Sequence, residues 1–439
     1  MSKYTPHTQS DIKEMLEALG LKKVEDLYSS IPENIRYPQI ENSLDGMTEG
    51  DAERKITAMA DKNRTYNSIF LGAGAYKHYI PAPVRKLAER SEFVTAYTPY
   101  QAEMSQGILQ SIYEYQSLIC RLTGMEVSNA SHYDGATAAA EALLMFKNSS
   151  KKKVLVSEHI KPQTKEVIKT YLEECGIEIQ TIPAQGLACT NIDVMRTMLT
   201  EEVAAVYVEQ PNFLGVIEDM QAISDAVHQA GAKFVAGVYP ISLGLLKRPG
   251  EYGADVAVGE GQSLGMNLSF GGAYLGFMAT RKEHMRKLPG RIVGETVDGN
   301  GNKAYVLTLQ AREQHIRREK ATSNICSNEA HCALTAGMYL SFMGKEGIRK
   351  VAQSCVNNAH YFQFALAKAG IALKYRNEFF NEFVTISKCN AENLLNALSQ
   401  HGILGGYKIG THEILWCATE LNSREEMDRC ASICGEVNK

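Results

Sequence analysis

The chain has 439 residues, of which 44% are hydrophobic and 22% charged, with a formal net charge of −4. This length is enough for two or three domains with a sizeable core, and the composition is typical of a globular protein. The small negative charge gives no reason to expect binding to nucleic acid or to an anionic membrane. No segment resembles a signal peptide or a membrane span, and the ten cysteines include no Cys-x-x-Cys pair. We therefore expect a cytoplasmic protein with free thiols.

The first part of the chain, residues 1–62, is polar, and its pattern predicts a helical arm. Asp11 and Glu14 are spaced as in a capping box, an apolar stripe follows, and Gly20 ends the predicted helix. A second short helix is predicted over residues 24–30. The arm has too little core to stand alone, so we expect it either to pack across another surface or to cap the main domain.

Residues 63–310 alternate between strand-like and helix-like patterns. The strands are nearly continuous apolar runs, which is typical of a sheet with both faces covered by helices. The clearest of them are residues 153–157, 177–182, 203–208 and 233–238. The pattern predicts an α/β domain with a mostly parallel, doubly covered sheet.

The remainder, residues 311–439, begins with a charged segment that is predicted to be helical. A long helix is expected around residues 329–342, and β-type runs return at 381–387 and 413–418. We expect these elements to form a smaller C-terminal α+β domain.

The segment 254–277 predicts a buried strand, a polar glycine-rich loop and a second buried strand. Large α/β enzymes often carry a cofactor-anchoring lysine in such a loop. Here the loop contains Gln262, which cannot form an imine, and no lysine lies between Arg248 and Arg281. The sequence therefore indicates an enzyme fold whose usual nucleophile is missing.

A polar turn at Asp134 opens directly into an alanine-rich helix. The exposed amides of residues 135–137 would suit an anion such as the phosphate of a pyridoxal cofactor, but Asp134 itself would cap the same positive helix end. Pyridoxal enzymes also place a carboxylate after a central strand to pair with the ring nitrogen. The strand at 234–238 has none before Glu251, so independent pyridoxal catalysis is not expected.

Residues 261–265, Gly-Gln-Ser-Leu-Gly, match the nucleophile elbow of α/β-hydrolases, with Ser263 as the nucleophile. That motif needs a helix behind the serine, whereas glycines and a strand follow here. The hydrolase interpretation is kept as an alternative. None of the histidines stands in a His-Glu-x-x-His arrangement, and no metal site is expected.

Several longer segments resemble the glycine cleavage system P-protein, over nearly the whole chain. They are YTPYQAEMSQG at 97–107, LTGM at 122–125, RPGEYGAD at 248–255, the pair Gly271-Gly272, and LQAREQHIRREKATSNIC at 309–326. More narrowly, the chain is similar to the separate N-terminal half, called subunit 1 or the α subunit, of P-proteins that are split in two.

The resemblance implies a fold-type-I, aspartate aminotransferase-like architecture and an α2β2 heterotetramer with subunit 2. It implies that pyridoxal phosphate is bound by the partner subunit and not covalently by this chain. The implied reaction is decarboxylation of glycine through pyridoxal phosphate, with transfer of the aminomethyl group to the lipoyl group of H-protein. Gln262 would then lie near the position of the lysine that this chain lacks.

Two groups of residues are candidates for a pocket or interface. Tyr97, Tyr100, Gln101 and Glu103 combine aromatic and polar side chains on a proline-broken segment, and would form a pocket wall at the subunit junction or an ordinary polar turn. Arg312, His315, Arg317 and Arg318 concentrate positive charge beside Glu313 and Glu319. Their i,i+4 spacing favours an ion pair between Glu313 and Arg317, and recognition of a carboxylate or of an acidic H-protein surface is the alternative. An autonomous pyridoxal enzyme that uses an unexpected lysine also stays open.

Overall fold

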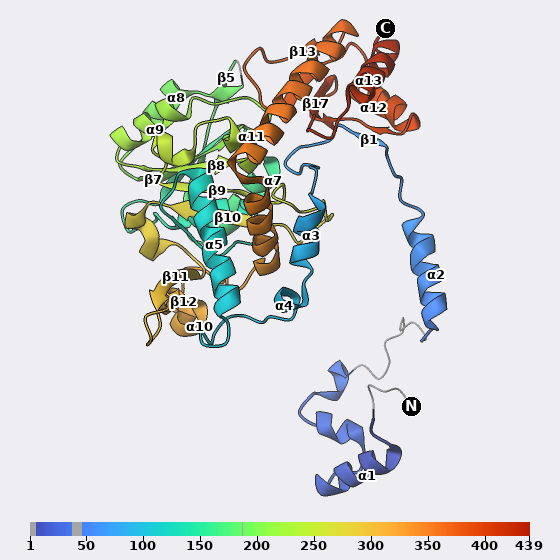
Figure 1. Cartoon of the computed structure of the whole chain (residues 1–439), viewed down its shortest axis with the longest axis vertical. Helices are drawn as coiled ribbons and strands as arrows, with labels where there is room; N and C mark the ends of the chain where they lie inside the picture. Colours follow the sequence, from blue (N-terminus) through green and yellow to red (C-terminus); the bar gives the residue numbers. More distant parts are fainter. Residues whose placement is uncertain (1–5, 37–45, 187) are drawn as a thin grey trace. The chain divides into compact units, whose positions relative to one another are not determined.

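The structure, a computed structural model, describes residues 6–36, 46–186 and 188–439. The chain divides into two compact units, Met1–Thr65 and Tyr66–Lys439 (Figure 1). The expected arm, 1–62, includes residues 1–5 and 37–45, which lie outside the described residues. The expected division of the remainder at residue 310 stays a prediction.

The first unit consists of short helices, and none of the described residues in them is buried. The capping box of the first helix begins at Thr8, whose backbone N–H donates to the Asp11 carboxylate at 2.6 Å. The predicted pairing of Asp11 with Glu14 is therefore wrong by one helical turn. Gly20, with a φ of 68°, lies just beyond the end of the helix, as expected. The elements are α1 (Gln9–Ala18), η1 (Val24–Tyr28), η2 (Glu33–Ile35) and α2 (Glu49–Ala60).

A seven-stranded sheet forms the centre of the second unit, within the part of the chain that the structure describes. Its order is β2-β10-β9-β8-β7-β3-β4; β9 to β4 run parallel, and β10 is antiparallel to both of its neighbours. The predicted mostly parallel sheet is confirmed. The strands are β2 (Val127–Ser128), β3 (Lys153–Ser157), β4 (Glu178–Ile182), β7 (Val203–Gln210), β8 (Lys233–Val238), β9 (Val256–Glu260) and β10 (Gly276–Thr280).

Helices cover both faces of this sheet. Along β7, Val206 and Val208 belong to one core cluster, and Ala205 and Tyr207 belong to another. The first cluster includes residues of α5 (Gln106–Thr123), α9 (Met220–Gln229) and α11 (Ala330–Lys368), and the second includes residues of α6 (Gly135–Leu144) and α7 (Pro162–Glu173). Both sides of the strands are buried, which explains their continuous apolar sequence.

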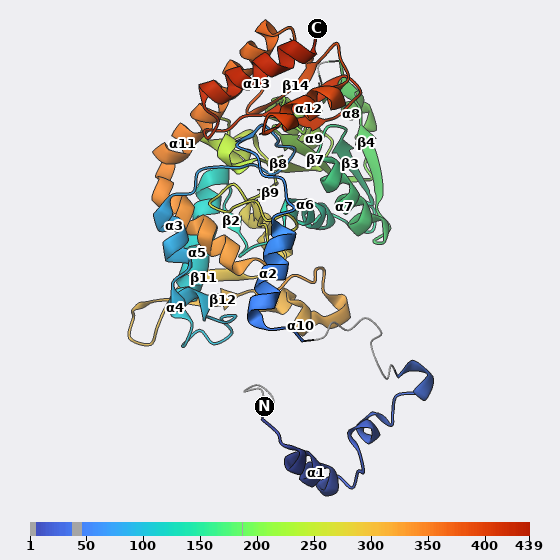
Figure 2. The same ribbon diagram turned by 90° about the vertical axis from the view of Figure 1, so that its right-hand side faces the viewer.

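The long helix α11 connects two cores. Its backbone leaves the helical conformation at Gly344, whose φ of 58° suits glycine. Before this kink Ala336 and Tyr339 pack in the core of the large sheet, and after it Phe362 and Leu366 pack in the C-terminal core. Figure 2 shows α11 passing from the side of α5 to the side of α13.

The C-terminal core lies between a four-stranded antiparallel sheet, in the order β13-β14-β17-β16, and the last helices. Trp416 and Phe383 are buried in it. Both strands predicted here are present, so the α+β pattern of this region is confirmed. The elements are β13 (Ala372–Leu373), β14 (Glu382–Ile386), α12 (Ala391–Gln400), β16 (Tyr407–Lys408), β17 (Glu413–Cys417) and α13 (Arg424–Val437).

Shorter elements connect these layers. The charged segment after residue 311 does not form the predicted helix, because the backbone at Arg318 has a φ of 54° and ends α10 (Gln314–Arg317) after four residues. No helix of the described part of the chain is long and apolar enough to cross a membrane. The other elements are β1 (Ser68–Ile69), α3 (Ala82–Ala88), α4 (Ser91–Val94), β5 (Ala184–Gln185), β6 (Cys189–Thr190), α8 (Ile192–Met198), η3 (Pro240–Gly244), η4 (Pro249–Tyr252), η5 (Lys282–Lys287), the hairpin β11 (Ile292–Val297) and β12 (Lys303–Thr308), η6 (Gln310–Arg312), η7 (Arg318–Lys320) and β15 (Ile403–Leu404).

Candidate functional site

A cavity of about 260 Å³ lies at the carboxyl ends of the parallel strands. Residues that follow or end β3, β7, β8 and β9 line it, together with the N-terminus of α6. Ligands of open parallel α/β sheets bind at this edge. We call it the sheet-edge cavity, and it is the place to test for a bound pyridoxal cofactor.

Gln262 lies in the turn after β9, beside this cavity, and it is buried. Its amide nitrogen donates to the carbonyl of Met266 at 2.8 Å, and its amide oxygen accepts the backbone N–H of Tyr76 at 3.1 Å. The Tyr76 hydroxyl in turn donates to the Glu382 carboxylate on β14 at 2.6 Å. Gln262 is therefore part of a network that links the large sheet to the C-terminal sheet.

The N-terminus of α6 is occupied by carboxylates of the chain itself. The backbone N–H of Thr137 donates to Asp134 at 2.7 Å, so Asp134 caps the helix as one of the two interpretations expected. The backbone N–H of Gly135 donates to Glu260 at 3.0 Å. A side chain at Gly135 would place its Cβ 2.7 Å from the backbone nitrogen of Glu260. The end of β9 therefore abuts the helix start, where a phosphate would have to bind.

Glu260 is held inside this arrangement by further backbone donors. The N–H groups of Gln262 and Leu275 both donate to its second oxygen at 3.0 Å. Burial nevertheless raises the pKa of Glu260 to about 7, against the opposing effect of these hydrogen bonds. The Glu260 carboxyl group thus accepts hydrogen bonds where the end of β9 meets the start of α6, and so helps to hold the two elements together.

The cavity contains one carboxylate that the sequence argument did not consider. Glu209 is the last residue but one of β7, lies next to β8 in the sheet, and is 3% exposed. It accepts the Tyr207 hydroxyl at 3.0 Å and the Lys161 backbone N–H at 3.0 Å, and the Lys161 ammonium lies 3.7 Å away. A carboxylate near the end of a buried apolar strand could have been recognised as a candidate from the sequence. The strand that was considered ends at Val238 without an acid, as the sequence indicated.

These residues do not fit a covalently bound pyridoxal phosphate. The position expected for the lysine holds a hydrogen-bonded glutamine, and the helix end that would bind phosphate is filled by two carboxylates. Lys161 is the only lysine that lines the sheet-edge cavity within the described residues, and it pairs with Glu209. It is the residue on which the alternative of an autonomous pyridoxal enzyme depends.

The hydrolase alternative finds no support at Ser263. Its side chain is buried, and its hydroxyl has no hydrogen-bond partner among the described residues, so no histidine activates it. A turn and then β10 follow the motif, without the helix that a nucleophile elbow requires.

A second cavity, of about 430 Å³, lies beside the segment that carries Tyr97 and Tyr100. Tyr97 and Cys326 line it together with the buried guanidinium group of Arg291. That group donates to Ser327 at 2.8 Å and to Tyr100 at 3.2 Å, and lies 5.0 Å from the centre of the Tyr100 ring. We call this space the Arg291 cavity. The side chains of Gln101 and Glu103 are exposed and do not line it.

The predicted ion pair between Glu313 and Arg317 is wrong. Glu313 is buried and instead lies 3.4 Å from Arg291 and 3.5 Å from His315. Glu313 and Arg317 are one helical turn apart, since the Arg317 N–H donates to the Glu313 carbonyl at 3.0 Å, but the Glu313 carboxylate pairs with Arg291 from another segment instead. Arg312 and Arg317 line a third cavity, whereas His315 and Arg318 do not.

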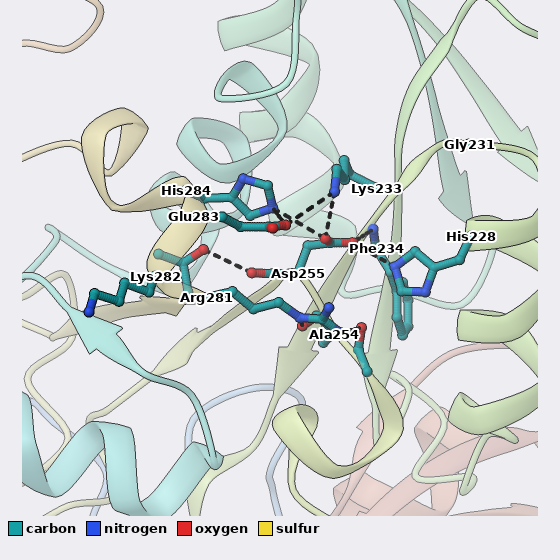
Figure 3. Close-up of polar contacts among 12 residues, drawn as sticks. His228, Gly231, Lys233, Phe234, Ala254, Asp255, Arg281, Lys282, Glu283 and His284 are labelled. Carbon is teal, nitrogen blue, oxygen red and sulfur yellow. Dashed lines mark hydrogen bonds and ion pairs between the residues drawn. The ribbon is translucent and has the colours of Figure 1, made fainter.

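A separate polar cluster lies at the amino edge of the sheet, where β8 and β9 begin (Figure 3). Buried Asp255 accepts hydrogen bonds from His228 at 2.8 Å, from Lys233 at 3.0 Å and from His284 at 3.2 Å. Burial alone would raise the pKa of Asp255, but these donors and the backbone N–H of Phe234 hold it well below its usual range.

This Asp255 cluster is one of two groups of side chains that could supply metal ligands. Asp255, Glu283 and His284 form the first group, and His78, Cys355 and Glu420 form the second. In the first group the Lys233 ammonium already lies 3.0 Å from Asp255 and 3.6 Å from Glu283, so a cation of the protein pairs with both carboxylates. The expectation that the chain has no metal site stays a prediction.

The architecture places the chain in a known structural class. It is similar to aspartate aminotransferase of subgroup IV from Thermus thermophilus, with a TM-score of 0.58 and 14% identity, over 84% of this chain and 99% of that chain. This is the fold of fold-type-I pyridoxal-phosphate-dependent transferases, and the predicted fold class is confirmed.

Sequence comparison identifies the family. The model of the glycine cleavage system P-protein matches residues 2–433. The chain is 49% identical over 433 residues to a probable glycine dehydrogenase (decarboxylating) subunit 1 of Moorella thermoacetica, covering 97% of each. It is 46% identical over 442 residues to the protein of the same name from Carboxydothermus hydrogenoformans, covering 99% of each. The chain belongs to the glycine cleavage system P-protein family, and the resemblance inferred from its motifs is confirmed.

A solved structure supports the same assignment. It is a crystal structure of glycine decarboxylase (P-protein) of the glycine cleavage system in inhibitor-bound form, with a TM-score of 0.91 and 43% identity. The match covers 99% of this chain and 100% of that chain. The expectation of an enzyme is therefore confirmed.

Proposed function

We propose that the chain is the subunit of a glycine dehydrogenase (decarboxylating) that does not carry the cofactor. Its full-length relatives bear the name subunit 1, which implies a second subunit. That partner would supply the lysine and bind pyridoxal phosphate in an α2β2 heterotetramer. The complete enzyme would decarboxylate glycine and pass the aminomethyl group to the lipoyl group of H-protein in the cytoplasm.

One observation carries this proposal. The residue at the expected lysine position is Gln262, whose amide oxygen and amide nitrogen both form hydrogen bonds. Glu260 and Asp134 accept hydrogen bonds from backbone N–H groups at the N-terminus of α6, where a phosphate would bind, which also supports the proposal.

The chain would contribute instead through the Arg291 cavity. Tyr97 is 83% exposed at its mouth, which is unusual for a large aromatic side chain and suits burial by a partner. Inside, Arg291 fixes the orientation of Tyr100, and the other walls are mainly apolar. Such a wall would exclude water from a shared site. Gln101 and Glu103, on the same segment, would lie at the subunit interface.

Reconstitution tests this function. The purified chain is mixed with the lysine-bearing partner subunit and H-protein, and glycine-dependent exchange of labelled carbon dioxide is measured. Activity is expected only when both subunits are present. Full activity of the partner without this chain would contradict the proposal.

The autonomous alternative has its own test. The chain alone is incubated with pyridoxal phosphate, reduced with borohydride and digested, and its peptides are analysed by mass spectrometry. We expect no cofactor on any lysine of the chain. Stoichiometric modification of Lys161, lost in the Lys161→Arg variant, would show that this chain binds the cofactor itself.

A further inference from the structure

A third cavity, of about 300 Å³, lies between the C-terminal part of α6 and the segments 286–290 and 312–325. It shares no lining residue with the sheet-edge cavity. Its cationic lining residues are Lys147, Arg286, Lys287, Arg312 and Arg317. Its acidic lining residues are Glu141 and Glu313. We call it the basic pocket.

The positive charge of the basic pocket is not neutralised by the protein. None of its five cations forms an ion pair within the described part of the chain. Glu313 is already paired with Arg291 at 3.4 Å and lies near His315. A concave surface with a net positive charge concentrates field lines and attracts anions.

Arg312 is held in a fixed orientation in this pocket. Its Nε donates to the carbonyl of Leu309 at 3.1 Å, and its Nη2 donates to the carbonyl of Gly290 at 2.9 Å. Its Nη1 is buried and has no hydrogen-bond partner among the described residues. An unpaired buried donor on a charged group is costly, so an acceptor from outside the chain would stabilise it.

Glu141 opposes an anion less than its charge suggests. Its side chain is buried and accepts a hydrogen bond from the Ser323 hydroxyl at 2.7 Å. Burial raises the pKa of Glu141 to about 7, so a substantial fraction of this group is neutral at neutral pH. The pocket therefore combines five cations, one paired carboxylate and one partly protonated carboxyl group.

We propose that the basic pocket binds a small molecule that carries a phosphate group. The cations belong to three separate segments and converge on one concave space, which suits the several oxygens of a phosphate better than a single carboxylate. The volume is at the lower end of the range for small-molecule sites. The proposal does not depend on the proposed function, because binding of phosphate to the pocket can be measured without glycine decarboxylation.

The binding test uses the full-length chain, alone and after assembly with its partner subunit. Inorganic phosphate and pyrophosphate are titrated calorimetrically at constant ionic strength, with chloride and citrate as comparison anions. We expect saturable binding of phosphate and pyrophosphate in both forms, with one site per chain. Heats that do not exceed those of chloride, or tighter binding of citrate, would overturn the proposal. Loss of binding on assembly would do the same, because it would assign the cations to a subunit interface.

Two substitutions are expected to change the affinity in opposite directions. Arg317→Gln removes an exposed cation and should weaken binding about tenfold, as expected for a lost charge-assisted hydrogen bond. Glu141→Gln keeps an acceptor for Ser323 but removes the negative charge, and should tighten binding. Lys350→Gln, at an exposed position of α11 that is not in the pocket, is the matched control. Equal affinity of the wild type and the three variants would rule the site out. A folding defect could weaken binding but could not tighten it, so the tighter binding expected of Glu141→Gln has no such explanation.

Discussion

The carboxylate of Glu260 accepts a hydrogen bond from the backbone N–H of Gly135 at 3.0 Å, so the end of β9 closes the N-terminus of α6. The N-terminus of a helix is the natural binding site for an anion, because its first N–H groups have no acceptor within the helix and the helix dipole is positive there. The chain satisfies that end with its own side chains. The helix end that could bind a phosphate therefore links α6 to the end of β9.

Replacing Gln262 by lysine should not create a cofactor site. The new ammonium group would be buried, would leave the Tyr76 N–H without its acceptor, and would face a helix end that is still occupied. We expect no cofactor absorbance when pyridoxal phosphate is added to Gln262→Lys. We also expect a loss of about 2–4 kcal/mol in the free energy of unfolding, measured with urea.

The exposed Gln221→Lys variant is the control for this change. It should unfold within about 0.5 kcal/mol of the wild type, because a surface substitution alters little packing. A pyridoxal adduct that borohydride fixes on residue 262 of the lysine variant would contradict this prediction, because it would show that the helix end can accept the cofactor phosphate.

Glu141 should make the stability of the chain depend on pH. Its pKa is about 7 in the folded chain, against an ordinary pKa of 4.5 for glutamate, so the folded state binds the proton more tightly. The stabilisation is complete below pH 4.5 and is lost as the pH rises through about 7. Glu141→Gln, which is never ionised, should be more stable than the wild type at pH 8 by about 1–3 kcal/mol.

Urea unfolding at pH 5 and pH 8 measures this difference. The exposed Glu174→Gln variant should follow the wild type within about 0.5 kcal/mol at both values. A Glu141→Gln variant that loses as much stability between the two pH values as the wild type would contradict the assignment.

Asp255 should be one of the most sensitive positions in the fold. Asp255→Asn removes a buried charge that faces Lys233, His228 and His284, and leaves the lysine without its nearest partner. We expect a loss of about 3–5 kcal/mol at pH 7. The pKa of Asp255 is held low, so its stabilisation is present above pH 3.8 and should disappear as the pH falls below that value.

Asp193→Asn is the matched control, because Asp193 forms an exposed ion pair with Arg196 at 3.3 Å. Its loss should cost at most about 1 kcal/mol. Comparable losses at the two positions, measured by urea unfolding at pH 7, would mean that the Asp255 cluster contributes no more than a surface pair.

The sequence predicted the local elements well and the tertiary contacts poorly. The strand at 203–208 and the absence of lysine near Gln262 follow from apolar runs and residue identity, which are local properties. The pairing of Arg291 with Glu313 and the contact of Glu260 with Gly135 join residues far apart in the chain. No periodicity records such contacts. The Glu313 prediction was wrong because it considered only neighbours on the same helix, whereas the carboxylate pairs with Arg291 from another segment.

Tyr97 provides the test of the proposed shared site. Its side chain is 83% exposed, so Tyr97→Ala should leave the free energy of unfolding of this chain within about 0.5 kcal/mol of the wild type. If a partner covers Tyr97, the same change should lower the glycine exchange activity of the reconstituted enzyme, or its affinity for the partner, by about tenfold or more. Phe364→Ala removes another large exposed ring, on α11 and outside the Arg291 cavity. It should change neither the glycine exchange activity nor the affinity for the partner. An equal effect of the two substitutions would show that the Arg291 cavity has no special part in the assembled enzyme.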